Sequence, residues 1–198
     1  MSFTAIAGLP DGDAVDGRSP KRTYLINEYS GDADSSSRDD TISIARRDHP
    51  KKFYDIYKYP RFADPYFSPD ERYLIINDRN GSGWIECAVL IQINKPPFFV
   101  NSHKIDEECW KLFWSSHKSA KKILYDHRST YFCEWLDPTH LVVGLQGNHS
   151  FPDPGALRWS LGGGWHCVYD VARDKAYTNK YTDSKNTQCE FEIDEEQK

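Results

Sequence analysis

The sequence has no long apolar segment and little excess charge. No stretch approaches the roughly 20 apolar residues that a membrane-spanning helix needs. The N-terminal segment MSFTAIAGLPDGDAVDG has neither the basic start nor the apolar core of a secretory signal. The sequence contains 25 Lys and Arg residues and 30 Asp and Glu residues, which gives a net charge of −5. Nucleic-acid-binding proteins, in contrast, usually carry a basic surface. We therefore expect a cytoplasmic protein that binds neither a membrane nor a nucleic acid.

Recognisable metal and cofactor motifs are also missing. The five cysteines are odd in number, widely spaced and without a C-x-x-C pair, which favours reduced, mostly buried thiols over a disulfide framework or a zinc knuckle. The seven histidines show no H-x-H or H-x-x-x-H spacing, although a zinc site built from distant residues such as His166 and Cys167 stays open. Asp32, Asp34 and Ser36 alternate as in a calcium loop, but the glycine and glutamate of such a loop are absent. We expect neither a metal nor a cofactor.

No catalytic motif stands out either. The sequence has no G-x-S-x-G elbow, and Gly162-Gly163-Gly164 is not followed by the lysine of a phosphate-binding loop. The adjacent pairs Ser116-His117 and His149-Ser150 are poorly placed to work as nucleophile and base. The sequence therefore predicts no catalytic residue and favours a protein that is not an enzyme.

Aromatic residues are abundant, and their pattern indicates β structure. The chain has 6 Trp, 12 Tyr and 10 Phe, but methionine only at its first position, and aromatic side chains fit pleated, half-buried surfaces. Alternating or apolar runs bounded by turn residues predict strands at 23–29, 41–46, 53–59, 72–77, 86–94, 121–126, 130–136, 140–146, 165–171 and 175–181. Pro65 and Pro69 are expected to interrupt strand pairing between the third and fourth of these strands.

One segment breaks this β pattern. In 105–118, Ile105, Cys109, Leu112 and Phe113 recur at helical spacing, and acidic residues fill the first turn, where they suit the helix dipole. The aromatic stripe of this helix, with Trp110 and Trp114, is either part of the core or a surface for a partner. The predicted fold is mainly β with antiparallel sheets in propeller-like or sandwich-like repeats and one inserted α-helix near 105–118. A flexible arm is expected over 1–20, a single β-rich domain over 21–190 and an acidic tail over 191–198.

A short motif recurs along the chain. Phe67-Ser68-Pro69-Asp70 precedes the strand that begins Tyr73-Leu74, and weaker copies of that strand lie at 24–28 and 140–144. The motif resembles the blade repeat of TolB-like β-propellers. This chain departs from that repeat at Glu71, where the family usually has glycine. The resemblance implies short sheets that bury their apolar faces against one another. Propellers generally close with 4 to 8 blades, so three copies are too few for an ordinary ring. Three architectures are possible: an open stack of blades, a ring completed by two chains, or successive hairpins of a sandwich.

The segment 144–165, GLQGNHSFPDPGALRWSLGGGW, is predicted to be a long loop between two strands. Loops of this length often carry function, and Trp and Arg are enriched among interface hot spots. The candidate binding residues are His149, Phe151, Asp153, Arg158, Trp159 and Trp165, with Arg158 and Trp159 as anchors. The alternative is a loop whose aromatic residues fold back onto the core.

These observations favour a non-catalytic protein-binding domain, of which an immunity-type protein that neutralises a basic toxin is one example. Two alternatives stay open: a hydrolase-type enzyme, since TolB-like repeats also accompany peptidases, and a small-ligand domain that stacks a carbohydrate on tryptophan. Pairing with a second copy of the chain is a further option, because partial blades would leave strand edges to be covered.

Overall fold

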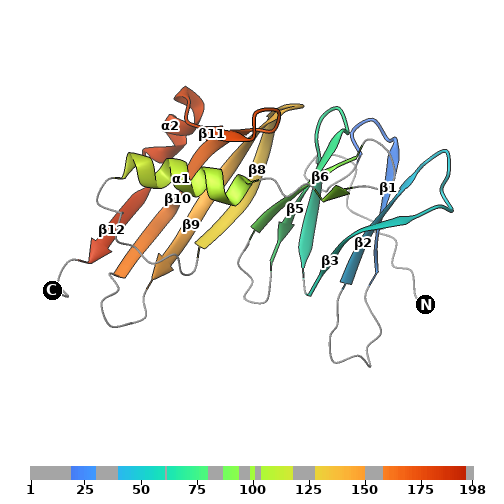
Figure 1. The fold of residues 1–198 in the computed structure, drawn as a ribbon, viewed down its shortest axis with the longest axis horizontal. Helices are drawn as coiled ribbons and strands as arrows, with labels where there is room; N and C mark the ends of the chain where they lie inside the picture. The colour runs from blue at the N-terminus through green and yellow to red at the C-terminus, as the bar shows by residue number, and fades with distance from the viewer. Residues whose placement is uncertain are drawn as a thin grey trace. The chain divides into compact units, whose positions relative to one another are not determined.

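The computed structural model describes residues 19–29, 40–60, 62–79, 87–93, 99–100, 104–117, 128–149 and 158–194. The chain divides into two compact units, residues 1–102 and 103–198. As predicted, the fold is mainly β, and the described residues form three antiparallel sheets and two helices (Figure 1). The single domain expected over 21–190 stays a prediction, because a compact unit is a cluster of contacts and need not fold by itself. None of the described helices is both long and apolar enough to cross a membrane.

Unit 1 contains two sheets whose strands follow one another in chain order. The first has the order β1-β2-β3 and the second β4-β5-β6-β7. Their bounds are β1 Tyr24–Tyr29, β2 Asp40–Arg46, β3 Tyr54–Tyr59, β4 Ala63–Phe67, β5 Tyr73–Asp78, β6 Cys87–Gln92 and β7 Phe99–Val100. The two sheets share one apolar core, in which Ile42 and Ile44 of β2 join Leu74 and Ile76 of β5 with no exposed surface. Burial of such side chains contributes roughly 1.5–3 kcal/mol each.

Strand β4 was not predicted. It contains Pro65, which lies opposite Ile76 of β5. β4 forms the edge of its sheet, and an edge strand tolerates proline, which has no N–H to donate to the ladder. The expectation that Pro65 would interrupt strand pairing was therefore wrong.

The motif before β5 is a closed turn. The Tyr73 N–H donates to Ser68 Oγ at 3.0 Å, and the Glu71 N–H donates to the Ser68 carbonyl at 2.9 Å. Glu71 has a φ of 62°, which is the left-handed conformation that glycine adopts most easily. Its buried carboxylate accepts hydrogen bonds from Ser19 Oγ and from the Lys21 N–H. Glu71 thus holds a backbone conformation that favours glycine and adds a side-chain contact that glycine cannot make.

The same turn precedes β1. The Tyr24 N–H donates to Ser19 Oγ at 3.0 Å, the Arg22 N–H donates to the Ser19 carbonyl at 2.9 Å, and Arg22 has a φ of 59°. Ser19 is 7% exposed. Residues 19 and 20 were expected to end a flexible arm, but they belong to this turn, whereas residues 1–18 lie outside the described part of the chain.

A shorter turn, without the serine and the left-handed residue of the other two, precedes β9. Asp137 Oδ1 accepts from the N–H groups of Thr139, at 2.7 Å, and His140, at 3.0 Å. We call these three segments the strand-start turns. In each, the carbonyl just before the strand accepts a backbone hydrogen bond from the end of a later strand: Arg47 to Thr23 at 2.9 Å, Ile93 to Arg72 at 2.7 Å, and Val171 to Thr139 at 2.9 Å. The three sheets therefore share this backbone hydrogen bond at the start of a strand, while their relation to propeller blades stays a prediction.

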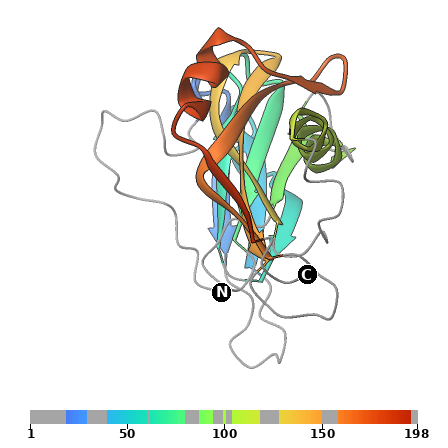
Figure 2. The same ribbon diagram turned by 90° about the vertical axis from the view of Figure 1, so that its left-hand side faces the viewer.

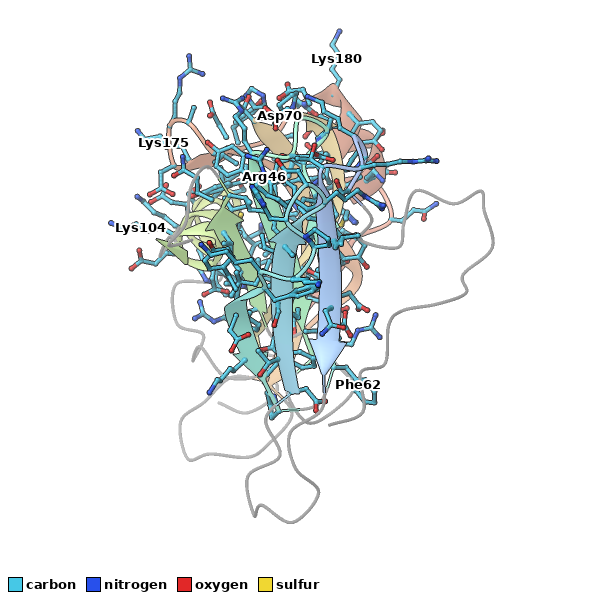
Figure 3. All side chains as sticks on the ribbon, turned by 90° about the vertical axis from the view of Figure 1, so that its right-hand side faces the viewer. Arg46, Phe62, Asp70, Lys104, Lys175 and Lys180 are labelled. Atoms are coloured by element: carbon cyan, nitrogen blue, oxygen red, sulfur yellow. The ribbon has the colours of Figure 1, made fainter. Side chains whose placement is uncertain are left out.

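In unit 1, Asp70 of a strand-start turn and Arg46 at the end of β2 lie at one end, and Phe62 lies at the other (Figure 3).

Unit 2 is one sheet with two helices. Its elements are α1 Ile105–Ser116, β8 Arg128–Asp137, β9 His140–His149, β10 Arg158–Asp170, β11 Lys175–Tyr177, α2 Lys180–Asn186 and β12 Glu190–Asp194. The strand order is β11-β10-β9-β8, and β12 also pairs with β10. The predicted helix at 105–118 is confirmed, and strand β12 extends into the segment expected as an acidic tail. The strand expected at 121–126 lies outside the described residues.

Helix α2 was not predicted. A strand was expected over 175–181, but β11 ends at Tyr177 and α2 begins at Lys180. Asn179 caps the helix, since its side chain accepts from the N–H groups of Tyr181 and Thr182, each at 3.0 Å. The Thr182 hydroxyl in turn accepts from the Asn179 N–H at 2.9 Å. These reciprocal bonds form a capping box, which fixes where a helix starts.

The two helices lie on opposite faces of the unit 2 sheet (Figure 2). Side chains alternate along β10. Trp165 therefore points to the α1 face, where its ring meets Phe113 at 5.3 Å, and His166 belongs to the α2 face, where its backbone N–H and carbonyl are hydrogen-bonded to the Asn186 side chain at 2.6 and 2.9 Å. In the aromatic stripe of α1, Trp110 and Phe113 are buried in the core, whereas Trp114 is half-buried.

Candidate functional site

The long loop expected at 144–165 is mostly strand. β9 runs to His149, and β10 begins at Arg158, so only 150–157 separates them. Trp159 pairs with His149 across the two strands. The glycines at 162–164 lie within β10, where the register with β9 shifts between Leu161 and Trp165. Gly164 has a φ of 71°, which suits such an irregularity. The loop prediction was wrong because a glycine-rich stretch can remain inside a strand where the ladder bulges.

The six predicted binding residues do not form one described surface. Phe151 and Asp153 lie outside the described residues, and the side chains of His149, Arg158 and Trp159 are not described either. Trp165 is 5% exposed and packs against Phe113, so its ring is part of the unit 2 core. The binding role assigned to these six residues stays a prediction.

A different surface of unit 2 presents aromatic rings to solvent. Tyr177 is 38% exposed and Tyr181 is 41% exposed, so both rings reach solvent. Tyr177 of β11 lies in register with Val168, which faces Val142, which in turn faces Glu134 of β8. Cross-strand partners point to the same side of a sheet. Tyr177 and Glu134 therefore lie at the two ends of one row on the α2 face.

Tyr181 of α2 completes this surface. Its hydroxyl donates a hydrogen bond to the carboxylate of Glu134, and Lys185 Nζ lies 3.2 Å from Glu134 Oε1 and 4.9 Å from the centre of the Tyr181 ring. The hydrogen bond from the Tyr181 hydroxyl, and to a smaller extent Lys185, holds the pKa of Glu134 below its ordinary value. Tyr181 is thus held at its hydroxyl by Glu134 and at its ring by Lys185. We call Tyr177, Tyr181, Glu134 and Lys185 the tyrosine face.

A group of charged residues borders the tyrosine face. The His140 ring lies 6.3 Å from the Tyr177 ring, with its Nδ1 2.8 Å from Asp137 Oδ2 and its Nε2 3.6 Å from Asp170 Oδ2. Burial alone would raise the pKa of Asp137, but hydrogen bonds from Thr139 and His140 lower it. The side chain of Asp137 is 47% exposed, so its carboxylate is presented to solvent near Tyr177.

The arrangement around His140 suits a structural role better than catalysis. A histidine between two carboxylates could activate a hydroxyl, and Thr139 Oγ1 lies 3.3 Å from His140 Nδ1. That hydroxyl, however, donates to Asp137 Oδ1 at 3.0 Å, and Asp137 also accepts the backbone N–H groups of the β8–β9 turn. The group therefore closes the turn, and its hydrogen bonds are used within it.

Three of the five cysteines, Cys109, Cys133 and Cys167, are poorly placed to act as nucleophiles. All five are free, and Cys109 and Cys167 are fully buried. Burial raises the pKa of Cys133 to about 12, so its thiol stays protonated at neutral pH, whereas a nucleophilic cysteine needs a lowered pKa. In the part of the chain that the structure describes, no three His, Cys, Asp or Glu side chains group as they would around a metal ion.

Sequence reasoning missed Tyr177, Tyr181, Glu134 and Lys185 as functional candidates. The strand expected over 175–181 would have placed both tyrosines on one strand instead of on a strand and a helix. The signal that could have corrected this is Asn179 followed three residues later by Thr182, a capping pair in which threonine replaces the usual glutamate or glutamine. No protein-family model, curated protein or solved structure matches the chain.

Proposed function

We propose that the protein is a non-catalytic domain that binds another protein through its tyrosine face. The observation that carries this proposal is the pair of exposed rings, Tyr177 and Tyr181, on one side of a rigid sheet. Tyrosine supplies a large contact area for little loss of side-chain entropy and is enriched at interface hot spots. Because Tyr181 is already held by Glu134 and Lys185, little further ordering is needed on binding.

The charges around the rings favour a partner with a basic surface. Glu134 and Asp137 are 41% and 47% exposed, and both have pKa values below the ordinary range, so they are ionised at neutral pH. Lys185 Nζ lies 3.2 Å from Glu134 Oε1 and partly balances its charge, whereas the Asp137 carboxylate stays exposed to solvent. Exposed carboxylates beside aromatic rings steer a basic partner towards the face and fix its orientation.

A toxin-neutralising, immunity-type role is the specific form of this proposal. An immunity protein must cover a basic toxin surface without performing chemistry, and an aromatic face with ionised carboxylates is suited to that task. The five free cysteines support a reducing compartment such as the cytoplasm. A second copy of the chain is a competing occupant of the same face, and it is separated from a foreign partner by the mass of the complex.

The test is affinity capture with matched variants. The immobilised wild-type chain, the double variant Tyr177→Ser with Tyr181→Ser, and a control with Phe53→Ser and Phe62→Ser are each exposed to lysate of the source cells. The control residues are 41% and 66% exposed and lie in unit 1. We expect one protein to be retained at equal stoichiometry by the wild type and the control and to be lost from the tyrosine variant. Retention by all three, or by none, would refute the proposal.

A further inference from the structure

A hollow lies beside helix α1, on the opposite side of the unit 2 sheet from the tyrosine face. Its volume is about 660 Å³, which is within the range of roughly 300–1,000 Å³ that small-molecule sites occupy. Its charged lining comes from the start of α1 and from β8 and consists of Lys104, Asp106, Glu107, Glu108, Lys111 and Arg128. Two indoles, Trp110 and Trp114, complete it.

The charges of this hollow cancel. Three carboxylates and three cations line it, so its formal net charge is zero. Lys111 Nζ lies 3.0 Å from Glu108 Oε1, and Arg128 lies 3.7 Å from Asp106 Oδ2. The result is a wall in which hydrogen-bond acceptors and donors stand side by side. At these two pairs, a charged ligand would meet a like charge beside the opposite one.

The part of the hollow that Trp110 and Asp106 line is held by a chain of hydrogen bonds. Trp110 Nε1 donates to Thr130 Oγ1 at 3.1 Å, and the Thr130 hydroxyl donates to Asp106 Oδ1 at 2.6 Å. The guanidinium of Arg128 lies over the Trp110 ring at 5.5 Å. The second carboxylate oxygen of Asp106 faces Arg128. The Asp106 and Arg128 side chains are therefore ordered before any ligand binds, which reduces the entropy lost on binding.

Trp114 is the more exposed of the two tryptophans that line the hollow. It is half-buried, and its ring lies against the fully buried Trp110 ring at 5.3 Å with an angle of 29° between the planes. The two residues are four positions apart on α1 and therefore lie on the same face of the helix. The stacking sets the orientation of the Trp114 indole, while part of its surface remains accessible to a ligand.

We propose that this hollow binds a neutral saccharide of one or two rings. A sugar hydroxyl both donates and accepts hydrogen bonds, so neighbouring hydroxyls match a wall of adjacent carboxylates and cations. The apolar C–H face of a sugar ring can lie on the Trp114 indole, as apolar groups do on aromatic faces. This site is separate from the tyrosine face, and its occupation does not depend on the protein partner proposed above.

The test is calorimetric titration of the wild-type chain with a panel of neutral sugars: glucose, galactose, mannose, N-acetylglucosamine, maltose, cellobiose and lactose. Arginine and citrate serve as charged probes. We expect saturable binding of at least one sugar and none of arginine or citrate. Absence of saturation with every sugar, or binding of a charged probe alone, would overturn the proposal.

Variants then locate the sugar that binds. Trp114→Leu removes the aromatic surface and is expected to weaken binding about threefold to tenfold. Glu107→Gln tests the exposed rim without disturbing the core, and it is expected to weaken binding less. Asp183→Asn, an exposed change on α2, is the matched control and should leave binding unchanged. If Trp114→Leu unfolds the chain, the affinities of Glu107→Gln and Lys111→Met for the sugar test the site instead. Wild-type affinity in both variants would show that the sugar binds elsewhere and would refute the assignment.

Discussion

Arg22 and Glu71 hold the same left-handed backbone conformation at the same position of two strand-start turns, with φ values of 59° and 62°. Each N–H donates to the carbonyl of a serine, Ser19 or Ser68, at 2.9 Å. The two side chains differ, since Arg22 is exposed while Glu71 is buried and accepts hydrogen bonds from Ser19 and Lys21. The turn therefore fixes the backbone in both copies, and only Glu71 adds a contact between the two turns.

Replacement of each residue by glycine separates these two contributions. Arg22→Gly relieves the strained backbone without removing a described contact, so the free energy of unfolding should stay unchanged or rise by up to about 1 kcal/mol. Glu71→Gly gains the same relief but leaves the buried Ser19 hydroxyl and the partly buried Lys21 N–H without their acceptor, which costs about 1–3 kcal/mol. Urea unfolding followed by circular dichroism measures both. Equal effects of the two changes would contradict the role given to the Glu71 carboxylate.

Asp137 tests the strand-start turn before β9. Asp137→Ala removes the acceptor for the Thr139 and His140 N–H groups, and loss of such a cap costs about 1–2 kcal/mol of unfolding free energy. Asp137→Asn keeps a side-chain oxygen for these donors and should retain more than half of that stability. Thermal or urea unfolding of both variants at neutral pH provides the measurement. An asparagine variant as unstable as the alanine variant would show that charge, and not the cap, is what matters.

Gly144 is predicted to be intolerant of any side chain. It pairs with Tyr131, and a Cβ at Gly144 would lie 2.2 Å from Tyr131 Cζ. Gly144→Ala should therefore destabilise the chain by about 1–3 kcal/mol, as overpacking does. The double variant Gly144→Ala with Tyr131→Leu removes the clash, so a double-mutant cycle should show a favourable coupling between the two changes. Additive effects would contradict the close contact.

Acid should destabilise the protein through Asp170. Burial alone would raise the pKa of Asp170, but hydrogen bonds from the backbone N–H groups of Arg173 and Ala172, with His140 and Arg173 nearby, hold it below its ordinary value. A carboxylate with a lowered folded-state pKa contributes stability that is fully present above the unfolded value of about 3.9 and is lost as the pH falls through the folded value.

The measurement is the urea midpoint as a function of pH for the wild type and Asp170→Asn. The variant should be less stable at neutral pH and should lose less of its remaining stability below about pH 4, since the titrating group is gone. Parallel curves for the two proteins would show that Asp170 does not contribute to acid sensitivity.

Much of the fold follows from local sequence pattern. The helix at 105–116 was predictable because Cys109 and Phe113 repeat at helical spacing and both are fully buried. The strands around Leu74 and Val142 were predictable because apolar runs between turns leave few alternatives. β4 was missed because an edge strand tolerates Pro65, and whether a strand lies at an edge depends on pairings between distant segments.

The candidate surfaces were much harder to predict. The tyrosine face joins Tyr181 of α2 to Glu134 of β8, and this contact exists only because both lie on one side of the sheet. The hollow likewise needs Arg128 of β8 beside Trp110 of α1. The sequence indicates which residue types favour interfaces, but tertiary packing decides which of them are exposed. Trp165, for example, has the residue type of a hot spot and is buried in the core.

Hydroxyl-radical footprinting of the chain with and without its captured partner tests the proposed function most directly. Oxidation of each side chain is read by mass spectrometry, and the exposed residues Phe53 and Phe62 serve as internal references. The tyrosine face predicts that the partner protects Tyr177 and Tyr181 and leaves both phenylalanines unchanged. Protection of the phenylalanines with unaltered oxidation of the two tyrosines would contradict it.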